Sequence, residues 1–187
     1  AYKIVGGSEP SLGILLSYPG IEINKTSRRV SLTNIENINK SNNNKSLKKT
    51  KVSFIGSGNY ATSVLIPAFK DAGADLKSVA SNTGVSGVHA GKKFGFEEAT
   101  TDNEHLFNDG ETDAVVITTR HNSHAEFVLR ALKAKKHVFV EKPLCLSLDE
   151  LDTIEGNYSS SNILMVGFNR RFAPQVKKIK NLLNDVS

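Results

Sequence analysis

The chain of 187 residues contains one cysteine, one methionine and no tryptophan. The single cysteine, Cys145, excludes an internal disulfide, and the Cys and His residues lack the spacing of a zinc module. No apolar run approaches the roughly 18 residues that a membrane-spanning helix needs. The 14 glycines and 5 prolines are close to average usage, which excludes collagen-like and fully disordered chains. A globular protein without a resident metal remains, and the reducing cytoplasm is its default compartment.

Acidic residues are scarce only in the first part of the chain. The formal net charge is +5, and residues 1–51 hold nine Lys and Arg against three Asp and Glu. The rest of the chain is therefore close to neutral. We do not expect nucleic acid as a partner of the folded part, and a basic tether for polyanions would rest on the N-terminal segment alone.

The N-terminal segment lacks the apolar content of a domain. Residues 13–18 and 29–32 are typical of short strands, but the unit is too small to fold alone, so residues 1–33 are expected to be the tail of an upstream domain. Residues 34–50 are rich in Asn and Lys and are interpreted as a solvated linker. The chain starts with alanine, and we expect it to be a piece of a longer protein.

From residue 51 onward, strand patterns alternate with helix patterns. Strands are predicted over residues 52–55, 76–80, 97–99, 114–118, 137–140 and 163–168, and helices over residues 59–72, 85–94, 103–107, 123–134 and 148–158. This alternation predicts an α/β domain over residues 51–168, with a doubly wound, mostly parallel sheet. A helix predicted over residues 174–184 follows the complete sheet, so residues 169–187 are expected to begin a second domain.

A glycine-rich turn joins the first predicted strand of this domain to the first helix. Gly56 and Gly58, followed by Asn59, Tyr60 and Ala61, form a G-x-G-x-x-A motif. In a strand–turn–helix context the first glycine allows a tight turn, the second lets a pyrophosphate approach the backbone, and the alanine keeps helix and strand close. Isolated glycines often serve only as turn residues, but this context favours a dinucleotide site at Gly56, Gly58, Asn59 and Tyr60.

The end of the second strand lacks the carboxylate that accepts hydrogen bonds from the ribose of NAD. Ser81, Asn82 and Thr83 stand there, and no arginine is present to pair with the 2′-phosphate of NADP. We expect Ser81 and Asn82 to contact the cofactor, which is NAD or NADP. Simple loop polarity is the alternative interpretation of these residues.

Polar residues also follow the later strands. In an open parallel sheet, ligands lie beyond the carboxyl ends of the strands, so these residues are expected to converge on one edge. The fourth strand is followed by Thr118, Thr119, His121 and His124, the fifth by Glu141 and Lys142, and the sixth by Asn169 and Arg171.

Residues 51–180 resemble the glucose-fructose oxidoreductase / inositol dehydrogenase / MocA family of NAD(P)-dependent oxidoreductases. The stretches 114–126 and 136–144 carry the resemblance, together with the Gly-Phe-Asn-Arg-Arg-Phe ending at 167–172, and the Glu-Lys-Pro triplet at 141–143 is specific. Arg120 replaces a usual proline and His121 a common asparagine, which bears on the geometry around the nicotinamide. Residues before the linker resemble the tail of an alcohol-dehydrogenase-like half found in fusions with this family.

The resemblance implies a Rossmann domain followed by a C-terminal domain built on a large antiparallel sheet, which this chain lacks. It also implies hydride transfer between NAD or NADP and the secondary alcohol of a sugar or an inositol-like polyol, in a homo-oligomeric enzyme. The missing domain would supply a substrate-binding wall and the Asp and His that assist the lysine. The present chain would therefore be inactive alone, and a non-catalytic dinucleotide-binding sensor or interaction module is the alternative.

Each candidate residue has an expected role and a simpler alternative. Lys142 is the predicted catalytic residue, because alcohol oxidation needs a group that takes the hydroxyl proton. Glu141, Thr118, Thr119, His121 and Arg171 are expected to contact the cofactor, and His124 and Asn169 the substrate. Surface lysine, ordinary strand residues and a helix-packing histidine are the respective alternatives for Lys142, the threonines and His124.

Overall fold

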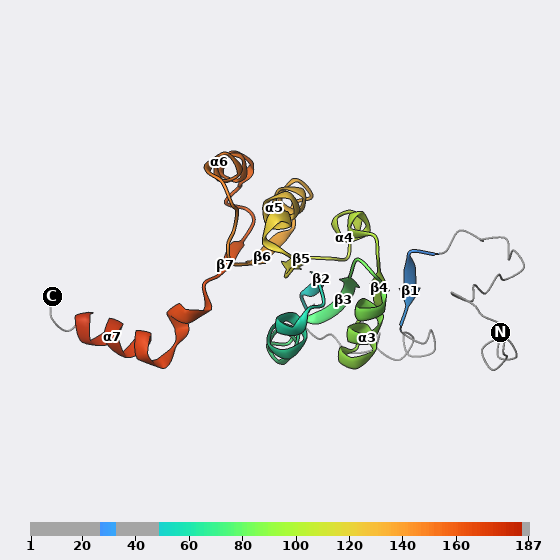
Figure 1. Cartoon of the computed structure of the whole chain (residues 1–187), viewed down its shortest axis with the longest axis horizontal. Helices are drawn as coiled ribbons and strands as arrows, with labels where there is room; N and C mark the ends of the chain where they lie inside the picture. The colour runs from blue at the N-terminus through green and yellow to red at the C-terminus, as the bar shows by residue number, and fades with distance from the viewer. Residues whose placement is uncertain (1–26, 33–48, 185–187) are drawn as a thin grey trace, which may run out of the picture.

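A computed structural model describes residues 27–32 and 49–184 of the chain (Figure 1). The strand predicted over residues 13–18 and nearly all of the linker predicted over residues 34–50 lie outside the described residues.

The described strands form one seven-stranded sheet with the order β1-β4-β3-β2-β5-β6-β7. All neighbours are parallel except β1 and β4, which are antiparallel. This arrangement confirms the predicted α/β class with a mostly parallel sheet. The strands are β1 (Arg29–Ser31), β2 (Lys51–Ile55), β3 (Asp75–Ala80), β4 (Glu98–Thr100), β5 (Ala114–Ile117), β6 (His137–Glu141) and β7 (Leu164–Gly167).

Helices fill the connections between the parallel strands, and a further helix, α7, follows the last strand. They are α2 (Ile66–Asp71), α3 (Val85–Phe94), α4 (Asn103–Asn108), α5 (His124–Lys133), α6 (Leu148–Asn157) and α7 (Pro174–Asn184). The helix predicted over residues 59–72 is not uniform, because a π-helical stretch, Ala61–Leu65, precedes α2. Ser147 caps the start of α6, since its hydroxyl accepts a hydrogen bond from the backbone N–H of Glu150 at 3.2 Å.

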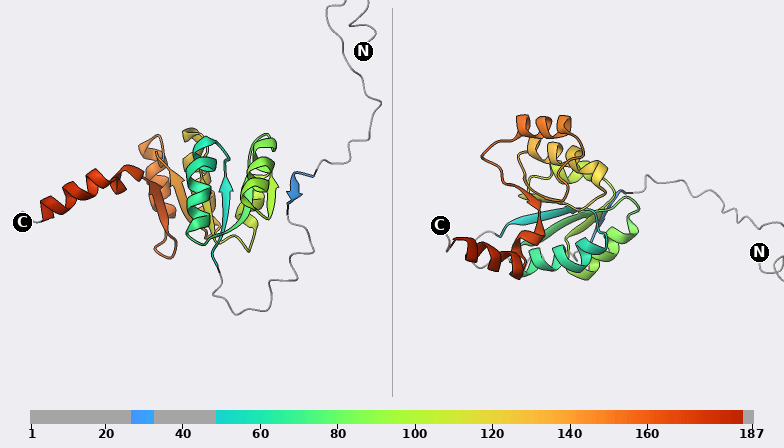
Figure 2. Two further views of the ribbon diagram at one scale, coloured as in Figure 1. Left: turned by 90° about the horizontal axis from the view of Figure 1, so that it is seen from below. Right: turned by 60° about the vertical axis from the view of Figure 1, so that its left-hand side comes forward.

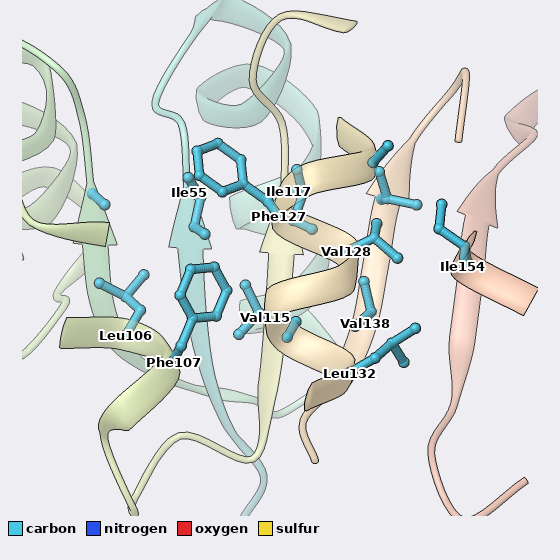
Figure 3. Packing of buried hydrophobic residues seen from close by; sticks show 14 residues of the cluster. Ile55, Leu106, Phe107, Val115, Ile117, Phe127, Val128, Leu132, Val138 and Ile154 are labelled. Atoms are coloured by element: carbon cyan, nitrogen blue, oxygen red, sulfur yellow. The ribbon is translucent and has the colours of Figure 1, made fainter. Parts of the chain in front are cut away.

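The two faces of the sheet are covered by different helices (Figure 2). Side chains alternate along each strand, so Val52 and Phe54 of β2 pack on the side of α2 and α3, whereas Ile55 packs on the other side. Figure 3 shows the buried cluster on the Ile55 side, in which Phe107 of α4, Val128 of α5 and Ile154 of α6 pack against the sheet. The partly buried Cys145 packs against this cluster. The sheet is thus buried on both faces, and its strand ends are left for a site.

Strand β1 comes from the segment that was grouped with the N-terminal tail, and it forms one edge of this sheet. It pairs with β4, and the guanidinium of Arg29 donates to the Glu98 carboxylate at 2.7 Å. Ser78 and His105 also hydrogen-bond Glu98. Burial opposes ionisation of this carboxyl, but these hydrogen bonds outweigh it and hold the pKa of Glu98 below its usual value. Residues 29–31 are therefore part of the sheet of the α/β domain.

Helix α7 extends away from β7 and leaves the sheet behind (Figures 1 and 2). Its apolar side chains Val176, Ile179, Leu182 and Leu183 are exposed, with Leu183 at 66%. In the described part of the chain, no helix combines the length and the apolar character needed to cross a bilayer.

Candidate functional site

The strand order reverses between β2 and β5, and two pockets open at the carboxyl ends of the strands there. In such sheets this reversal is where ligands bind. The first cavity, of about 750 Å³, is named the Lys142 pocket and is lined by Lys142, Glu141 and residues that follow β5 and β7. The second, of about 880 Å³, is named the Ser81 pocket and is lined by Ser81 and residues that follow β2, β3 and β5.

Every candidate residue predicted from the sequence lines one of these pockets. The phosphate-loop residues and the threonines after β5 lie between the two and contribute to both. Lining both pockets are Gly58, Asn59, Thr118 and Thr119; the Lys142 pocket adds Tyr60, His121, His124, Glu141, Lys142, Asn169 and Arg171, and the Ser81 pocket adds Gly56, Ser81 and Asn82.

Gly56 is required by the way the phosphate loop meets β5. Its φ is +105°, and a Cβ there would lie 2.7 Å from the Thr118 hydroxyl and 2.8 Å from the Thr118 carbonyl oxygen. The Thr118 hydroxyl donates to the Gly56 carbonyl at 3.1 Å, and the Thr118 N–H donates to the Ile55 carbonyl at 2.9 Å. Thr118 and Gly56 therefore fix the turn from which the following helix starts.

Gly58 has the opposite environment. A Cβ at Gly58 would meet nothing within 4 Å, and its backbone lies on the wall of both pockets. Free backbone N–H groups at the start of a helix attract anions. The open space at Gly58 thus suits a pyrophosphate that joins a ligand group in one pocket to a ligand group in the other.

The Ser81 pocket is polar but holds no carboxylate among its lining residues. The Ser81 hydroxyl is buried and accepts a hydrogen bond from the Gly87 N–H at 3.0 Å, while Ser57 donates to Ser86 at 2.9 Å. Asn82 is exposed and lies free to face a ligand. The sequence showed no arginine after β3, but the loop after β5 brings Arg120 to this pocket.

The Lys142 pocket contains the titratable groups of the site. Asn169, after β7, donates to the Tyr60 hydroxyl at 2.5 Å and to the Glu141 carboxylate at 3.4 Å. Gly167 leaves room for that carboxylate, because a Cβ at Gly167 would lie 2.6 Å from it. The side chain of Lys142 is exposed toward the pocket, beside a cis peptide bond to Pro143. The amine of Lys142, the carboxylate of Glu141 and the hydrogen-bonded amide of Asn169 thus surround one cavity.

His124 was predicted to contact substrate, with helix packing as the alternative. The structure buries this residue completely at the start of α5. Its ring nitrogens face the backbone carbonyls of Pro143 and Thr119. This environment agrees with the packing alternative.

A second charged cluster lies at the opposite edge of the sheet, near the amino ends of the strands. Lys77 forms ion pairs of 2.6 Å with both Glu97 and Glu111, and Lys51 pairs with Glu111 at 2.9 Å. Burial acts to lower the pKa of Lys77, but the two carboxylates outweigh it and raise that pKa. The two lysines hold the pKa of Glu111 near 2. Because parallel sheets bind ligands at the other edge, we interpret this cluster as structural.

Residues 27–32 and 49–184 include no group of His, Cys, Asp and Glu side chains that could hold a metal ion.

Two residues that line the Ser81 pocket, Ser86 and Arg120, were not among the cofactor contacts predicted from the sequence. Ser86 lies in the first turn of α3, directly beyond the β3 end. Arg120 lies in the loop after β5, and the usual strand order of a doubly wound sheet places β5 next to β2. Both residues could have been identified by placing the predicted strands in the usual order of a doubly wound sheet.

The comparisons with known proteins agree with this geometry. Residues 50–169 match the family described as "Oxidoreductase family, NAD-binding Rossmann fold" (GFO_IDH_MocA). Myo-inositol 2-dehydrogenase of Thermotoga maritima is 43% identical over 95 residues, which are 50% of this chain and 28% of that protein. Inositol 2-dehydrogenase/D-chiro-inositol 3-dehydrogenase of Lactiplantibacillus plantarum is 32% identical over 140 residues, 73% of this chain and 40% of that protein.

Solved structures give the same result. Myo-inositol dehydrogenase from Lactobacillus casei, in complex with NAD(H) and myo-inositol, superposes with a TM-score of 0.69 at 26% identity, covering 74% of this chain and 42% of that one. A 3-ketoreductase from Actinomadura kijaniata, bound to TDP-benzene and NADP, has a TM-score of 0.67 at 25% identity, covering 74% and 44%. The chain thus spans less than half the length of each of these relatives.

Proposed function

Because the chain belongs to the GFO_IDH_MocA oxidoreductase family, we propose that it is the NAD(P)-binding part of an enzyme that transfers hydride between a nicotinamide cofactor and a secondary alcohol. The observation that carries the proposal is the pair of pockets joined at Gly58. A dinucleotide has two nucleotide halves joined by a pyrophosphate, and the site has two cavities joined by an open helix N-terminus.

The residues that line the pockets divide between the two halves of such a cofactor. Gly58 and Asn59 would hold the pyrophosphate, with Thr118 keeping the loop in place. Asn82 and Arg120 would face the adenosine half in the Ser81 pocket. No carboxylate lines that pocket, so a 2′-phosphate meets no repulsion there, and we propose that both NAD and NADP are accepted.

The nicotinamide half would lie in the Lys142 pocket, where the ring accepts or returns a hydride when it is bound. Lys142 is the proposed catalytic residue, because its Nζ amine can take the proton of the substrate hydroxyl as the hydride leaves. Glu141 lies next to it on β6 and accepts a hydrogen bond from Asn169. These groups orient the cofactor and the substrate at the open side of the pocket, with Arg171 and His121 on its rim.

We propose a sugar or an inositol-like polyol as the substrate. Support comes from the inositol dehydrogenases among the relatives and from the polar groups around Lys142, which can bind several hydroxyls. Asn169 is the proposed substrate ligand, since its amide is exposed and lies between Tyr60 and Glu141.

We further propose that residues 169–187 begin a second domain, which would cover the exposed apolar side chains of α7. The whole protein would then work as a homo-oligomer in the cytoplasm. The single free cysteine, Cys145, is consistent with a reducing compartment.

The test is a turnover assay of the whole protein with a panel of polyols and sugars, in which the absorbance of the reduced nicotinamide is followed with NAD and with NADP. We expect turnover with at least one cyclic polyol or sugar. Tight binding of the dinucleotide without turnover on any member of the panel would instead support a non-catalytic sensor.

A further inference from the structure

His124 is completely buried, and both of its ring nitrogens face backbone oxygens. Nδ1 lies 2.6 Å from the carbonyl oxygen of Pro143, and Nε2 lies 3.1 Å from the carbonyl oxygen of Thr119. Carbonyl oxygens only accept hydrogen bonds, so the imidazole is the donor in these contacts. A neutral ring donates to one of the two carbonyls, and a protonated ring donates to both.

The two carbonyls belong to loops that carry the proposed cofactor and proton-transfer groups. Thr119 lines both pockets, and Pro143 directly follows Lys142. The pairing between β5 and β6 ends at Ile117 and Val140, so both carbonyls lie beyond the last paired residues. His124 therefore connects the segments that follow β5 and β6, beyond the point where backbone pairing between the two strands ends.

Local contacts hold the loop after β5 in shape but do not tie it to β6. The Thr119 hydroxyl bonds the Ser123 hydroxyl at 2.7 Å, and Ser123 donates to the Arg120 carbonyl at 2.8 Å. These contacts stay within one loop, whereas the imidazole of His124 reaches from that loop to Pro143. The ring of His121 packs edge-on against the ring of His124 at 5.6 Å between centroids.

We propose that His124 is a positioning residue, which sets the distance between the cofactor loop at Thr119 and the Lys142–Pro143 turn. This inference rests on the proposed function in that Lys142 is taken as the proton-transfer group. The ring is buried and its nitrogens face the backbone, so it acts through the two loops. Catalysis depends on placing the reacting groups within about 1 Å, which gives such a connection a direct effect on rate.

The first experiment measures the connection without any turnover. Hydrogen–deuterium exchange is compared in the whole protein for the wild type, His124→Phe and Val128→Ala. Phenylalanine retains the ring and removes both donors, and Val128 is an equally buried residue one turn further along α5 (Figure 3). We expect His124→Phe to exchange roughly tenfold faster or more in peptides covering 119–123 and 142–146, and Val128→Ala to leave both peptides at the wild-type rate relative to the rest of α5.

A conservative variant keeps the test decisive if the phenylalanine variant does not fold. His124→Gln supplies an amide with two N–H donors in place of the ring nitrogens. It should bring exchange in both peptides back toward the wild type. The connection would be overturned if each peptide exchanged at the same rate in every variant as in the wild type. It would also be overturned if His124→Phe accelerated exchange in only one of the two peptides.

The second experiment separates positioning from general loss of structure. In the whole protein we expect His124→Phe to lower kcat by roughly 10- to 100-fold, to change the KM for the dinucleotide by less than about threefold, and His124→Gln to recover part of kcat. A kcat within twofold of the wild type would overturn the positioning role. If the wild type itself turns over no substrate, the proposed function fails, and the exchange experiment still decides the connection.

Discussion

The two pockets lie along one sheet edge and share the phosphate loop, yet they differ in chemistry. The lining of the Ser81 pocket combines hydroxyls, amides and backbone with the apolar side chains Ile55 and Phe127, and Arg120 is its charged side chain. The lining of the Lys142 pocket includes Glu141, Lys142, two histidines and two arginines. A binding half needs complementary shape and hydrogen bonds, whereas a reacting half also needs groups that move protons. This difference supports the proposed function, in which the Ser81 pocket binds the adenosine half of the cofactor and the Lys142 pocket holds the reacting half.

The largest effect is expected from a substitution that removes a proposed proton-transfer group from the Lys142 pocket and leaves the Ser81 pocket unchanged. Lys142→Met should lower turnover of the whole protein by about 10²- to 10⁴-fold, because methionine keeps the stem but carries no proton. Affinity for the dinucleotide should stay within a few-fold of the wild type. The measurement is steady-state kinetics beside calorimetric titration, with Lys133→Met, an exposed lysine at the far end of α5, as the control. Turnover that survives the change would remove Lys142 from the reaction.

A substitution where the two pockets meet should weaken both. Gly58→Asp should lower the affinity for NADH and NADPH by well over tenfold, or about 1.4 kcal/mol or more, since its carboxylate occupies the space of the pyrophosphate and repels it. The protein itself should remain folded, because a side chain at Gly58 meets no neighbour within 4 Å.

Gly110→Asp is the matched control for this experiment. It adds the same charge at another glycine with open surroundings, in the segment that precedes β5 at the opposite edge. Equal affinities of the two variants in calorimetric titration would mean that the phosphate-loop assignment is wrong.

A charge at the Ser81 pocket should change selectivity rather than chemistry. Asn82→Asp should lower the ratio of NADPH affinity to NADH affinity by roughly three- to tenfold, about 0.7–1.4 kcal/mol, because the carboxylate repels a 2′-phosphate and accepts hydrogen bonds from a ribose. Asn82 is chosen over Ser81 because the Ser81 hydroxyl is buried against Gly87. The control is Asn108→Asp, an exposed asparagine at the end of α4; an unchanged ratio at Asn82 would place the adenosine ribose elsewhere.

The smallest effect on either pocket is expected from a substitution of Glu98, which lies on β4 beside the edge strand β1. Its pKa is lowered in the folded protein, so the folded state binds fewer protons than the unfolded state. The resulting stability is present above the ordinary glutamate pKa of about 4.3 and is lost as the pH falls below it. Glu98→Gln should lower the free energy of unfolding by roughly 1–2 kcal/mol at neutral pH. It should also make that free energy depend less on pH in the acid range.

Thermal unfolding between acid and neutral pH checks this prediction, with the exposed Glu155→Gln as the comparison. Dinucleotide affinity should be unaffected at neutral pH. A wild-type acid dependence in the Glu98 variant would show that the carboxylate network around β4 contributes nothing to stability.

Much of the fold could be predicted because each element carries its own signal. The buried apolar runs of β2 and β5 and the Ser147 cap of α6 are local features, and so is Gly56 in its turn. The site residues could be predicted as a group because parallel strands deliver their carboxyl ends to one edge.

Other features could not be predicted because they depend on contacts between distant residues. A short strand at residues 29–32 was predicted, but its place beside β4 was not, because Arg29 meets Glu98 across 69 positions of the sequence. The division of labour among the site residues is also non-local. His124 and Ser81 were expected to face ligands, and only the packed structure places their polar atoms against Pro143, Thr119 and Gly87.

The most direct test of the two-pocket account is a map of backbone amide shifts by NMR as NADPH is added to the protein. The account predicts saturable changes along both pockets, at Gly58, Asn82 and Thr119 and at Lys142, with little change at the Lys77 cluster on the opposite edge. Changes confined to the Lys77 edge, or no saturable change at all, would contradict it.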